Sequence, residues 1–487
     1  MLRIEVKRFG PIYEGNVRLR PLTIFVGPNG SGKSYLAEFI YALLSKPHIF
    51  FGGRKSRPIP AYFWLDLFNH PELSQGNKAA KEKWQSLVQL YVELINAENQ
   101  YRQKKINFSL LPEELRKLIH SVLQQFMLST KEKLFHEIRR CYGIEVSKLV
   151  MNKHESFNIT IEDSSRWSIV LFSLGDQLNV EKQELKLEDV FLPLLRPESS
   201  EKVGPFIYSY PDALTMAIFN VLNQFFQPIL IESKYLPAAR SGILQSHKAL
   251  TSFVVSRAPL AGVQTIEIPK LSGVVTDFIT ELLRLDIERK SELFDVATFL
   301  EEEVVSGRIT ISKKTEYPEI YYQHRDSSRF RLTLHRTSSM VSELAPVILF
   351  LKYIVRPGSL LILEEPEAHL HPACQRKVAR ALVKLVRKGT NVLITTHSDY
   401  LISQLSNFIR LSSLDEKQRT AFGYSPQDYL KSEEVGAYLF DVGEQKGGSV
   451  VKELTVNLQE GIPESEFTRI AESLYEETIL LEDRGDD

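Results

Sequence analysis

A loop that could bind phosphate lies near the start of the chain. Residues 27–34 have the sequence Gly-Pro-Asn-Gly-Ser-Gly-Lys-Ser, which matches the phosphate-binding loop pattern G-x-x-x-x-G-K-[ST]. The glycines allow backbone N–H groups to turn toward an anion, and a helix that follows adds the positive end of its dipole. In such a loop Lys33 reaches the β- and γ-phosphates of a nucleotide, and the Ser34 hydroxyl ligates Mg²⁺. The residues predicted to surround ATP here are Asn29, Gly30, Ser31, Gly32, Lys33 and Ser34.

Two adjacent carboxylates follow an apolar stretch much later in the chain. Residues 360–363 are Leu-Leu-Ile-Leu, and Glu364 and Glu365 come next. An apolar strand that ends in two carboxylates is typical of the second motif of phosphate hydrolases. Glu364 would hold Mg²⁺ through water, and Glu365 would polarise the attacking water. The alternative is an acidic turn on the surface, which the accompanying phosphate loop disfavours.

Histidines mark two further positions near these carboxylates. His397 follows the next apolar stretch, residues 391–395, where an imidazole can bond a γ-phosphate or the attacking water and so sense hydrolysis. A structural histidine is the alternative. His369 and His371 could ligate a metal, but no third ligand is apparent, so we interpret them as part of a loop at a dimer interface.

The elements that must position these groups alternate between strand and helix. Residues 22–26 are apolar and β-branched, as in a buried strand, and apolar residues recur at helical spacing after Ser34. The region before them alternates and predicts a β-hairpin. Strands at 359–363 and 391–395 enclose a helix that Gly389 ends. Such an alternation predicts a mostly parallel sheet, with ligands at the carboxyl ends of its strands.

The remaining segments complete a predicted α/β fold. Helical periodicity covers 78–140, 214–226 and 274–304, and strands are predicted at 157–161, 167–172 and, as a meander, over 308–334. We expect an α/β fold with a P-loop NTPase sheet and flanking helices, an N-terminal β-hairpin and a large, mainly helical insertion. The expected divisions are 1–50 and 229–410 for the two halves of the ATPase domain, 51–228 for the insertion and 411–487 for a C-terminal tail region.

One arginine is harder to interpret. Arg240 follows a predicted strand at 229–231, and it could contact phosphate, order a loop or form a structural salt bridge. The sequence leaves these alternatives open.

Composition sets limits on the class of protein. The 487 residues are 43% hydrophobic and 25% charged, which is ordinary for a globular protein, and the length predicts two or three lobes. A net charge of −1 argues against a strongly basic nucleic-acid binder, although a local basic patch remains compatible with it. Cys141 and Cys374 alone build no disulfide or zinc framework and fit a cytoplasmic location. The apolar window 214–231 carries several amides and a proline, so we expect a buried helix and no membrane partner.

The order of these motifs resembles that of the ABC-type ATPases. The phosphate loop, Ser338-Ser339 before a helix, the acidic strand end and Thr396-His397-Ser398 occur in the family's order. The run Glu-Glu-Pro-Glu-Ala-His-Leu-His-Pro at 364–372 looks like the soluble branch that contains SMC-like, RecF-like and OLD-family ATPases, often catalogued as AAA-15 or AAA-21. Transporter subunits usually have an Asp-Glu-Pro-Thr version. The resemblance is strong over 1–45 and 305–410 and weak in the middle.

This resemblance implies how the site would be completed. In the family, two subunits meet head to head and enclose ATP between the phosphate loop of one and the signature serine of the other. The signature serine here would be Ser338 or Ser339. Met340 stands where a glycine is usual, and its side chain would limit how closely the backbone approaches phosphate.

The resemblance also bears on function. OLD-family nucleases carry a Toprim domain after the switch histidine, and residues 399–487 are too few for one; 479–487 look like the start of such a domain, but we expect only an exposed acidic tail. We therefore predict a prokaryotic ATPase that uses ATP and Mg²⁺, forms a homodimer or higher oligomer, and gates a separate nuclease or toxin effector in phage defence. A DNA-repair ATPase that clamps DNA and a self-contained OLD-like nuclease are the alternatives.

Overall fold

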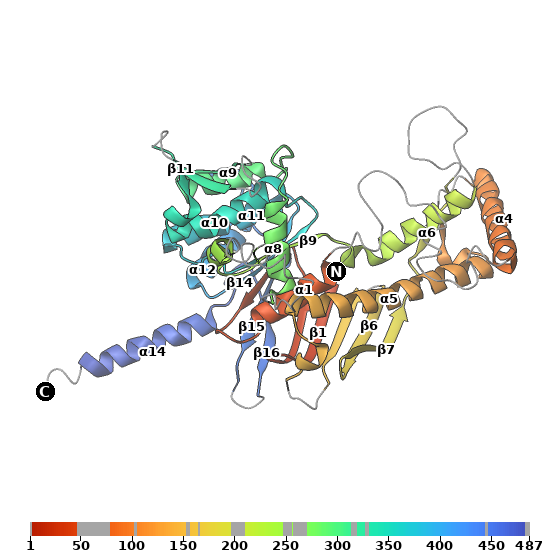
Figure 1. The fold of residues 1–487 in the computed structure, drawn as a ribbon, viewed down its shortest axis with the longest axis horizontal. Helices are drawn as coiled ribbons and strands as arrows, with labels where there is room; N and C mark the ends of the chain where they lie inside the picture. The colour runs from red at the N-terminus through yellow and green to blue at the C-terminus, as the bar shows by residue number, and fades with distance from the viewer. Residues whose placement is uncertain are drawn as a thin grey trace. The chain divides into compact units, whose positions relative to one another are not determined.

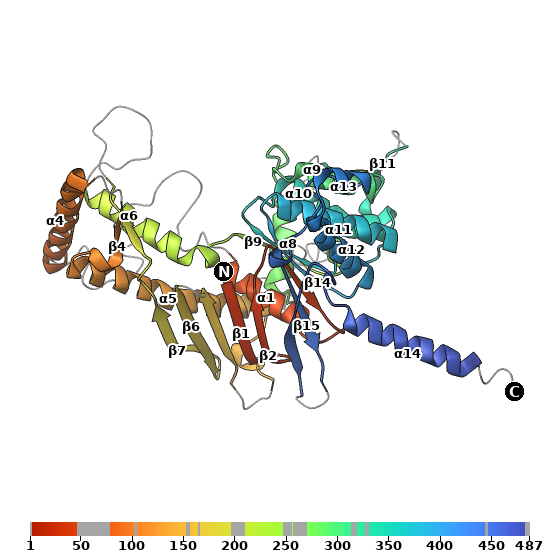
Figure 2. The same ribbon diagram turned by 180° about the vertical axis from the view of Figure 1, so that it is seen from behind.

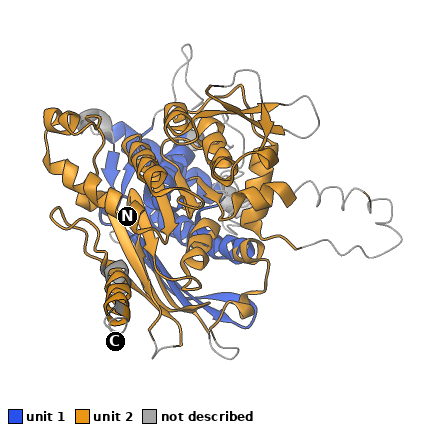
Figure 3. Ribbon diagram, turned by 90° about the vertical axis from the view of Figure 1, so that its left-hand side faces the viewer, with its two compact units in different colours: residues 1–4, 43–137, 158–231 blue, residues 5–42, 138–157, 232–487 orange. Residues whose placement is uncertain are grey.

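The structure is a computed structural model of the chain (Figure 1; Figure 2). It describes residues 2–45, 78–101, 105–151, 156–163, 166–195, 210–246, 256, 270–312, 319–326, 331–443 and 447–482. Two compact units make up the chain, and Figure 3 colours them separately. Unit 1 comprises residues 1–4, 43–137 and 158–231, and unit 2 comprises residues 5–42, 138–157 and 232–487.

Unit 2 is built on a sheet whose central strands are parallel. Its strands are most of β1 (Leu2–Phe9), β2 (Ile12–Arg18), β3 (Leu22–Val26), β9 (Ser233–Leu236), β13 (Leu360–Glu364), β14 (Asn391–Thr396), β15 (Val435–Asp441) and β16 (Ser449–Leu454). They lie in the order β1-β2-β16-β15-β3-β14-β13-β9, and the neighbours from β15 to β9 are parallel. The carboxyl ends of β3, β13 and β14 therefore lie at one edge of the sheet, as the sequence predicts.

Helices and a small meander complete unit 2. The helices are α1 (Lys33–Leu44), α8 (Gly273–Leu283), α9 (Phe294–Glu303), α10 (Ser339–Tyr353), α11 (Pro372–Arg387), α12 (Asp399–Arg410), α13 (Glu416–Ala421) and α14 (Ser465–Glu482). Strands β10 (Gly307–Ser312), β11 (Glu319–His324) and β12 (Leu332–Thr333) form the predicted antiparallel meander. Short 3₁₀ turns in this unit are η2 (Val146–Lys148), η5 (Leu334–Arg336), η6 (Leu411–Ser413) and η7 (Ser432–Glu434).

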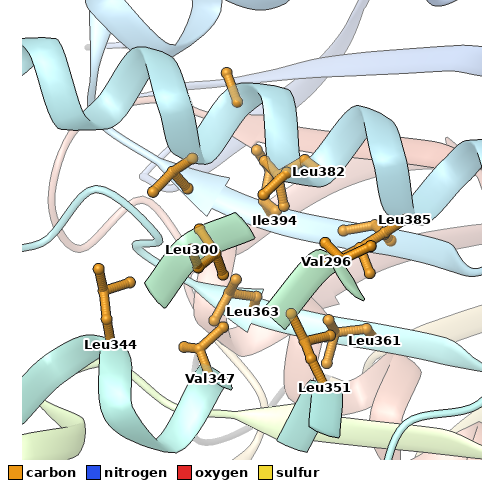
Figure 4. Packing of buried hydrophobic residues seen from close by; sticks show 14 of the residues in the cluster. Val296, Leu300, Leu344, Val347, Leu351, Leu361, Leu363, Leu382, Leu385 and Ile394 are labelled. Atoms are coloured by element: carbon orange, nitrogen blue, oxygen red, sulfur yellow. The ribbon is translucent and has the colours of Figure 1, made fainter. Parts of the chain in front are cut away.

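The core of unit 2 lies between one face of the sheet and helices α8 to α12. Strands β3, β13 and β14 are buried along almost their whole length, as expected for parallel strands covered on both faces. Figure 4 shows Leu361 and Leu363 of β13 packed with Val347 of α10, Leu300 of α9 and Leu382 of α11. The opposite face carries aromatic side chains instead. There Tyr41 of α1 contacts the ring of Tyr235 on β9, with ring centroids 5.4 Å apart.

Local signals fix the ends of the helices that flank the site. The Ser338 hydroxyl caps α10 by accepting a hydrogen bond from the Val341 N–H, at 3.4 Å. Helix α11 begins with Pro372 directly after its cap residue His371, and Gly389 follows its last residues, as predicted.

Unit 1 combines helices with short antiparallel strands. Its helices are α4 (Lys78–Tyr101), most of α5 (Glu113–Tyr142) and α6 (Tyr210–Phe226), followed by the turn η3 (Gln227–Ile229). Strands β5 (Asn158–Asp163), β6 (Trp167–Leu174) and β7 (Gln177–Leu185) pair antiparallel, as do β4 (Lys105–Asn107) and β8 (Phe191–Pro193), with η1 (Phe108–Leu110) after β4. The predicted apolar stripes are buried at Leu87, Tyr91 and Ile95 of α4 and along α5.

The structure corrects one predicted strand and extends the sheet. Residues 229–231 are not a strand, because α6 ends in the 3₁₀ turn that contains Pro228, and the strand forms four residues later as β9. Strand β7 was not predicted. Residues 435–454, which the sequence analysis placed in a tail region, supply β15 and β16, and β15 pairs with the strand that precedes the phosphate loop. In the described residues no helix is long and apolar enough to cross a membrane.

Candidate nucleotide site

The loop between β3 and α1 has the backbone that its glycines predict. Gly27 and Gly32 have φ angles of 145° and 98°, which residues with a Cβ atom rarely adopt. A Cβ on Gly27 would lie 2.6 Å from the Phe440 carbonyl oxygen of β15, and one on Gly32 would lie 2.8 Å from Ile12 of β2. The loop is thus packed closely on two strands, and only glycine fits at these positions.

Lys33 lies across this loop. Its Nζ donates hydrogen bonds to the carbonyl oxygens of Gly27 and Pro28, at 2.9 and 2.8 Å, and the residue is 5% exposed. Burial lowers the pKa of Lys33 to about 8, although the carboxylates of Glu365, Glu367 and Glu364 oppose the shift. Among the described residues, the hydrogen-bond acceptors of the ammonium group are two backbone carbonyls, and a phosphate oxygen could replace them.

The other loop residues divide into exposed and anchored ones. Asn29, Gly30 and Ser34 are exposed, whereas Ser31 is buried. The carbonyl of Ser31 accepts a hydrogen bond from the Ser449 hydroxyl of β16, at 2.6 Å. This anchor and the one from β15 were not predicted, because 418 residues separate Ser31 from Ser449 and no local pattern indicates the contact.

Glu364 ends strand β13 with a buried carboxylate. Its Oε2 accepts a hydrogen bond from the Ala238 N–H at 2.9 Å. Its Oε1 is buried and has no hydrogen-bond partner of normal geometry among the described residues, although burial and this nearby carboxylate raise the pKa of the Tyr235 hydroxyl. A buried carboxylate oxygen normally has a partner, so this atom fits a site for Mg²⁺ or for water bound to it.

Glu365 points elsewhere from the same strand end. Its φ of 42° is left-handed, its N–H donates to the Thr395 carbonyl at 2.9 Å, and its side chain is 41% exposed. Its Oε1 lies 3.9 Å from Nε2 of His397, at the end of the neighbouring strand β14. The structure thus brings Glu365 and His397 together. Lys33 lies near enough for its charge to interact with both side chains.

Glu367 holds the backbone that carries His397. Its Oε1 accepts hydrogen bonds from the Thr396 hydroxyl at 2.6 Å and from the His397 N–H at 2.8 Å, and burial raises its pKa. Burial and the Lys33 charge lower the pKa of His397, so its imidazole is neutral at pH 7. Glu367 was not predicted as a site residue; its position in the Glu-Glu-Pro-Glu run was the available signal.

Arg240 holds the backbone of the two carboxylate residues in place. The side chain is fully buried and donates to the carbonyl oxygens of Glu364 at 2.6 Å and Glu365 at 3.2 Å. It also lies 3.4 Å from Oε2 of Glu343, on α10. Of the alternatives that the sequence left open, the structure favours the ordering role with a buried salt bridge.

The predicted signature serines lie at a different place. Ser338 and Ser339 are exposed at the first turn of α10, and within the described residues no hydrogen bond or ion pair joins them to residues 27–34. Met340 is half-buried, and its side chain packs against the core of unit 2. His369 is exposed, and His371 caps α11. The described part of the chain has no group of three or more His, Cys, Asp or Glu residues arranged to hold a metal.

A P-loop NTPase is defined by a phosphate loop with its lysine and by carboxylates at the end of a nearby parallel strand, and this chain has both. The chain belongs to the AAA ATPase domain family AAA_15, whose profile matches residues 1–402. This family match confirms the predicted resemblance to soluble ATPases of the AAA-15 type, and the sheet with its flanking helices confirms the predicted fold class.

Similar solved structures include three SMC heads. An SMC head bound to the C-terminal winged-helix domain of ScpA has 12% identity and a TM-score of 0.35, with 93% of this chain and 97% of that chain covered. A Pyrococcus furiosus SMC head bound to the C-terminal domain of ScpA has the same identity and TM-score, with 98% and 100% covered. The Thermotoga maritima SMC head has 10% identity and a TM-score of 0.32, with 93% and 98% covered. No curated protein sequence matches this chain significantly.

Proposed function

We propose that this chain binds ATP with Mg²⁺ between two copies of itself and hydrolyses it, and that this cycle gates a separate effector protein. The observation that supports it best is the convergence of the loop lysine, the paired carboxylates and His397 at the carboxyl ends of three adjacent strands. Phage defence in a prokaryotic cytoplasm, with a nuclease or toxin as the effector, is the setting that we infer from the family resemblance.

The loop residues would bind the phosphates. Residues 29–33 offer backbone N–H groups, and Lys33 would exchange its bonds to Gly27 and Pro28 for bonds to the β- and γ-phosphates. The Ser34 hydroxyl and the free Oε1 of Glu364 would hold Mg²⁺ and its water ligands. When bound, Mg²⁺ supplies charge neutralisation for the phosphate oxygens.

Glu365 and His397 would act on the attacking water. The half-exposed Glu365 carboxylate is accessible to water and can accept its proton. The neutral His397 imidazole, held through its backbone by Glu367, can donate a hydrogen bond to the γ-phosphate and accept one from water. Both groups lie on neighbouring parallel strands, so their spacing is set by the sheet itself.

The second copy would complete the site. Ser338 and Ser339 are exposed at the N-terminus of α10, where backbone N–H groups and the helix dipole attract an anion. The Met340 side chain lies against the core and leaves this first turn uncovered. We infer that the γ-phosphate of ATP bound to one copy contacts these serines of the other copy.

The Glu365→Gln variant tests this function. It keeps the size of the side chain but removes the proton acceptor, so hydrolysis should fall by roughly 10²–10⁴-fold while ATP still binds. ATP should then persist between the subunits, and light scattering should give a larger mass with ATP than with ADP. Adding Ser339→Arg should abolish the mass increase without weakening nucleotide binding to the loop. An equal mass with ATP and ADP would contradict the proposed sandwich.

A further inference from the structure

The turn that follows β9, residues 237–241, includes the first two residues of a helix over 240–246 and contacts several functional groups at once. The Ala238 N–H donates to the Glu364 carboxylate at 2.9 Å, and Arg240 donates to the main chain of Glu364 and Glu365. The N–H of Ser241 donates to Glu343 Oε1 at 3.2 Å. One short segment therefore holds both carboxylate residues and a side chain of α10.

Arg240 is a rigid link within this turn. It is 0% exposed, its Nη1 donates to Pro237 O and Glu364 O, its Nη2 donates to Glu365 O, and its Nε donates to the Glu343 carbonyl. A planar guanidinium that is bonded on every side has little freedom to move alone. A displacement of α10 or of the carboxyl end of β13 is therefore transmitted through it.

Glu343 links the same turn to α10. It lies four residues after Ser339, one helical turn along, and is 1% exposed. Its Oε1 accepts a 2.6 Å hydrogen bond from the Ser241 hydroxyl, and its Oε2 faces Arg240. Because α10 is buried beyond its first turn, the exposed serines and Glu343 move as one body.

The turn has a backbone that depends on these contacts. Ala239 has a φ of 52°, in the left-handed region that alanine rarely adopts, and Glu365 has one of 42°. Two left-handed residues, one on each side of the Arg240 bonds, persist only where their surroundings hold them. A change in the position of α10 can therefore relax or tighten both.

We propose that Arg240 and Glu343 are positioning residues that couple the exposed serines of α10 to the carboxylates Glu364 and Glu365 of the same subunit. The inference rests on the proposed function, in which a partner's ATP contacts those serines. Occupation of Ser338 and Ser339 would fix α10, and through Glu343 and Arg240 it would set the geometry of the carboxylates. Each subunit would then hydrolyse its own ATP efficiently only when its serines engage the ATP of the partner.

The chain offers a matched control at the other end of α10. Glu301 of α9 is 4% exposed and forms an ion pair with Lys352 of α10, at 2.7 Å, and it accepts a hydrogen bond from the Ile309 N–H. Like Glu343, it is a buried carboxylate bonded to a cation and a backbone N–H. It differs in that its hydrogen bonds and ion pair within the described residues do not reach the 237–241 turn, so Glu301→Gln should reproduce the loss of stability without the loss of coupling.

The test compares Glu343→Gln with Glu301→Gln in two assays. In steady-state hydrolysis, Glu343→Gln should lower kcat about 10-fold and lower the Hill coefficient for ATP toward one, with nucleotide affinity unchanged. Glu301→Gln should leave kcat and the Hill coefficient at the wild-type values. If Glu343→Gln fails to fold, Ser241→Ala removes only the hydroxyl bond and should shift both quantities in the same direction, by about 3-fold in kcat.

Hydrogen exchange of the nucleotide-free protein separates this inference from the proposed function. In Glu343→Gln, the backbone amides of residues 364, 365, 367, 368 and 238–241 should exchange about 10-fold faster than in the wild type, and in Glu301→Gln they should not. If these amides exchange at the same rate in both variants, the proposed coupling is wrong, regardless of whether the protein hydrolyses ATP. The Glu343→Gln variant could also exchange faster while the wild-type protein neither hydrolyses ATP nor changes mass with it. That result would support the link from Glu343 to the carboxylates and would overturn the proposed function instead.

Discussion

The two halves of the nucleotide site are held in different ways. In the phosphate-loop half, Asn29, Gly30 and Ser34 are exposed, and Lys33 is bonded to carbonyls of its own loop. In the acidic half, hydrogen bonds from the 237–241 turn fix Glu364, and Glu367 fixes the backbone of His397. Binding must rearrange the first half, whereas the second is organised before any ligand arrives.

This difference separates binding from chemistry. A lysine that exchanges carbonyls for phosphate contributes mainly to nucleotide affinity. Groups that are positioned in advance around the attacking water contribute to the rate of the chemical step, because their reorganisation need not occur during reaction. Changes in the phosphate loop should therefore act on affinity and rate together, whereas changes at Glu365, Glu367 and His397 should act on rate alone.

The largest effect is expected at Lys33. Lys33→Ala removes the cation that would meet the β- and γ-phosphates, so we expect hydrolysis to fall to background and most nucleotide binding to be lost. Phosphate release and calorimetric titration with ATP measure the two effects. Lys234→Ala is a suitable control, because Lys234 is also largely buried but lies outside the loop, where it is ion-paired with Glu281. Normal hydrolysis by Lys33→Ala would overturn the assignment of the site.

A smaller effect is expected in the acidic half, at Glu367. Glu367→Ala leaves the Thr396 hydroxyl and the His397 N–H without their shared acceptor, so the imidazole should lose its fixed position. We expect kcat to fall by about 10- to 100-fold with little change in ATP affinity. Glu434→Ala, which removes a carboxylate that is ion-paired with Arg387 outside the site, should leave kcat unchanged. A large loss of affinity in Glu367→Ala would remove the distinction between the two halves.

The same difference explains which parts could be predicted from the sequence. The phosphate loop is eight consecutive residues between a strand and a helix, so its chemistry is determined by local order. Glu364, Glu365 and His397 were predicted because each stands at or directly after the end of an apolar strand, and parallel strands end at one edge of a sheet. Local periodicity likewise predicted most helices.

The features that could not be predicted depend on contacts between segments that are distant in the sequence. Arg240 meets Glu343 and Glu364 across 103 and 124 residues, and Phe440 of β15 packs under Gly27. Neither contact leaves a pattern in the neighbouring residues, because the order of strands in the sheet decides it. The strand misplaced at 229–231 has the same origin: its apolar residues fit a strand, but pairing with β13 begins at Ser233.

The smallest effect, and the one specific to the loop half, is a pH dependence of ATP affinity. Lys33 has a pKa of about 8 in the nucleotide-free protein. Bound phosphate stabilises the ammonium form, so the pKa of Lys33 rises on binding, and above pH 8 binding must take up a proton. The dissociation constant for ATP should therefore be constant below pH 8 and rise above it, by up to about 10-fold per pH unit. His397 does not add to this, because its lowered pKa keeps it neutral over the same range.

Calorimetric titration of the Glu365→Gln variant, which should not consume ATP, would measure this dependence on both sides of pH 8. Repeating it in buffers of different ionisation enthalpy counts the protons taken up. Lys33→Arg is the matched control, since a guanidinium stays protonated throughout and its affinity, even if weaker, should not change with pH. The dissociation constant of the protein that keeps Lys33 could instead stay unchanged as the pH rises above 8. That result would show that the pKa of Lys33 is the same with its carbonyl partners as with bound phosphate. The phosphate-loop half would then be as fixed before binding as the acidic half.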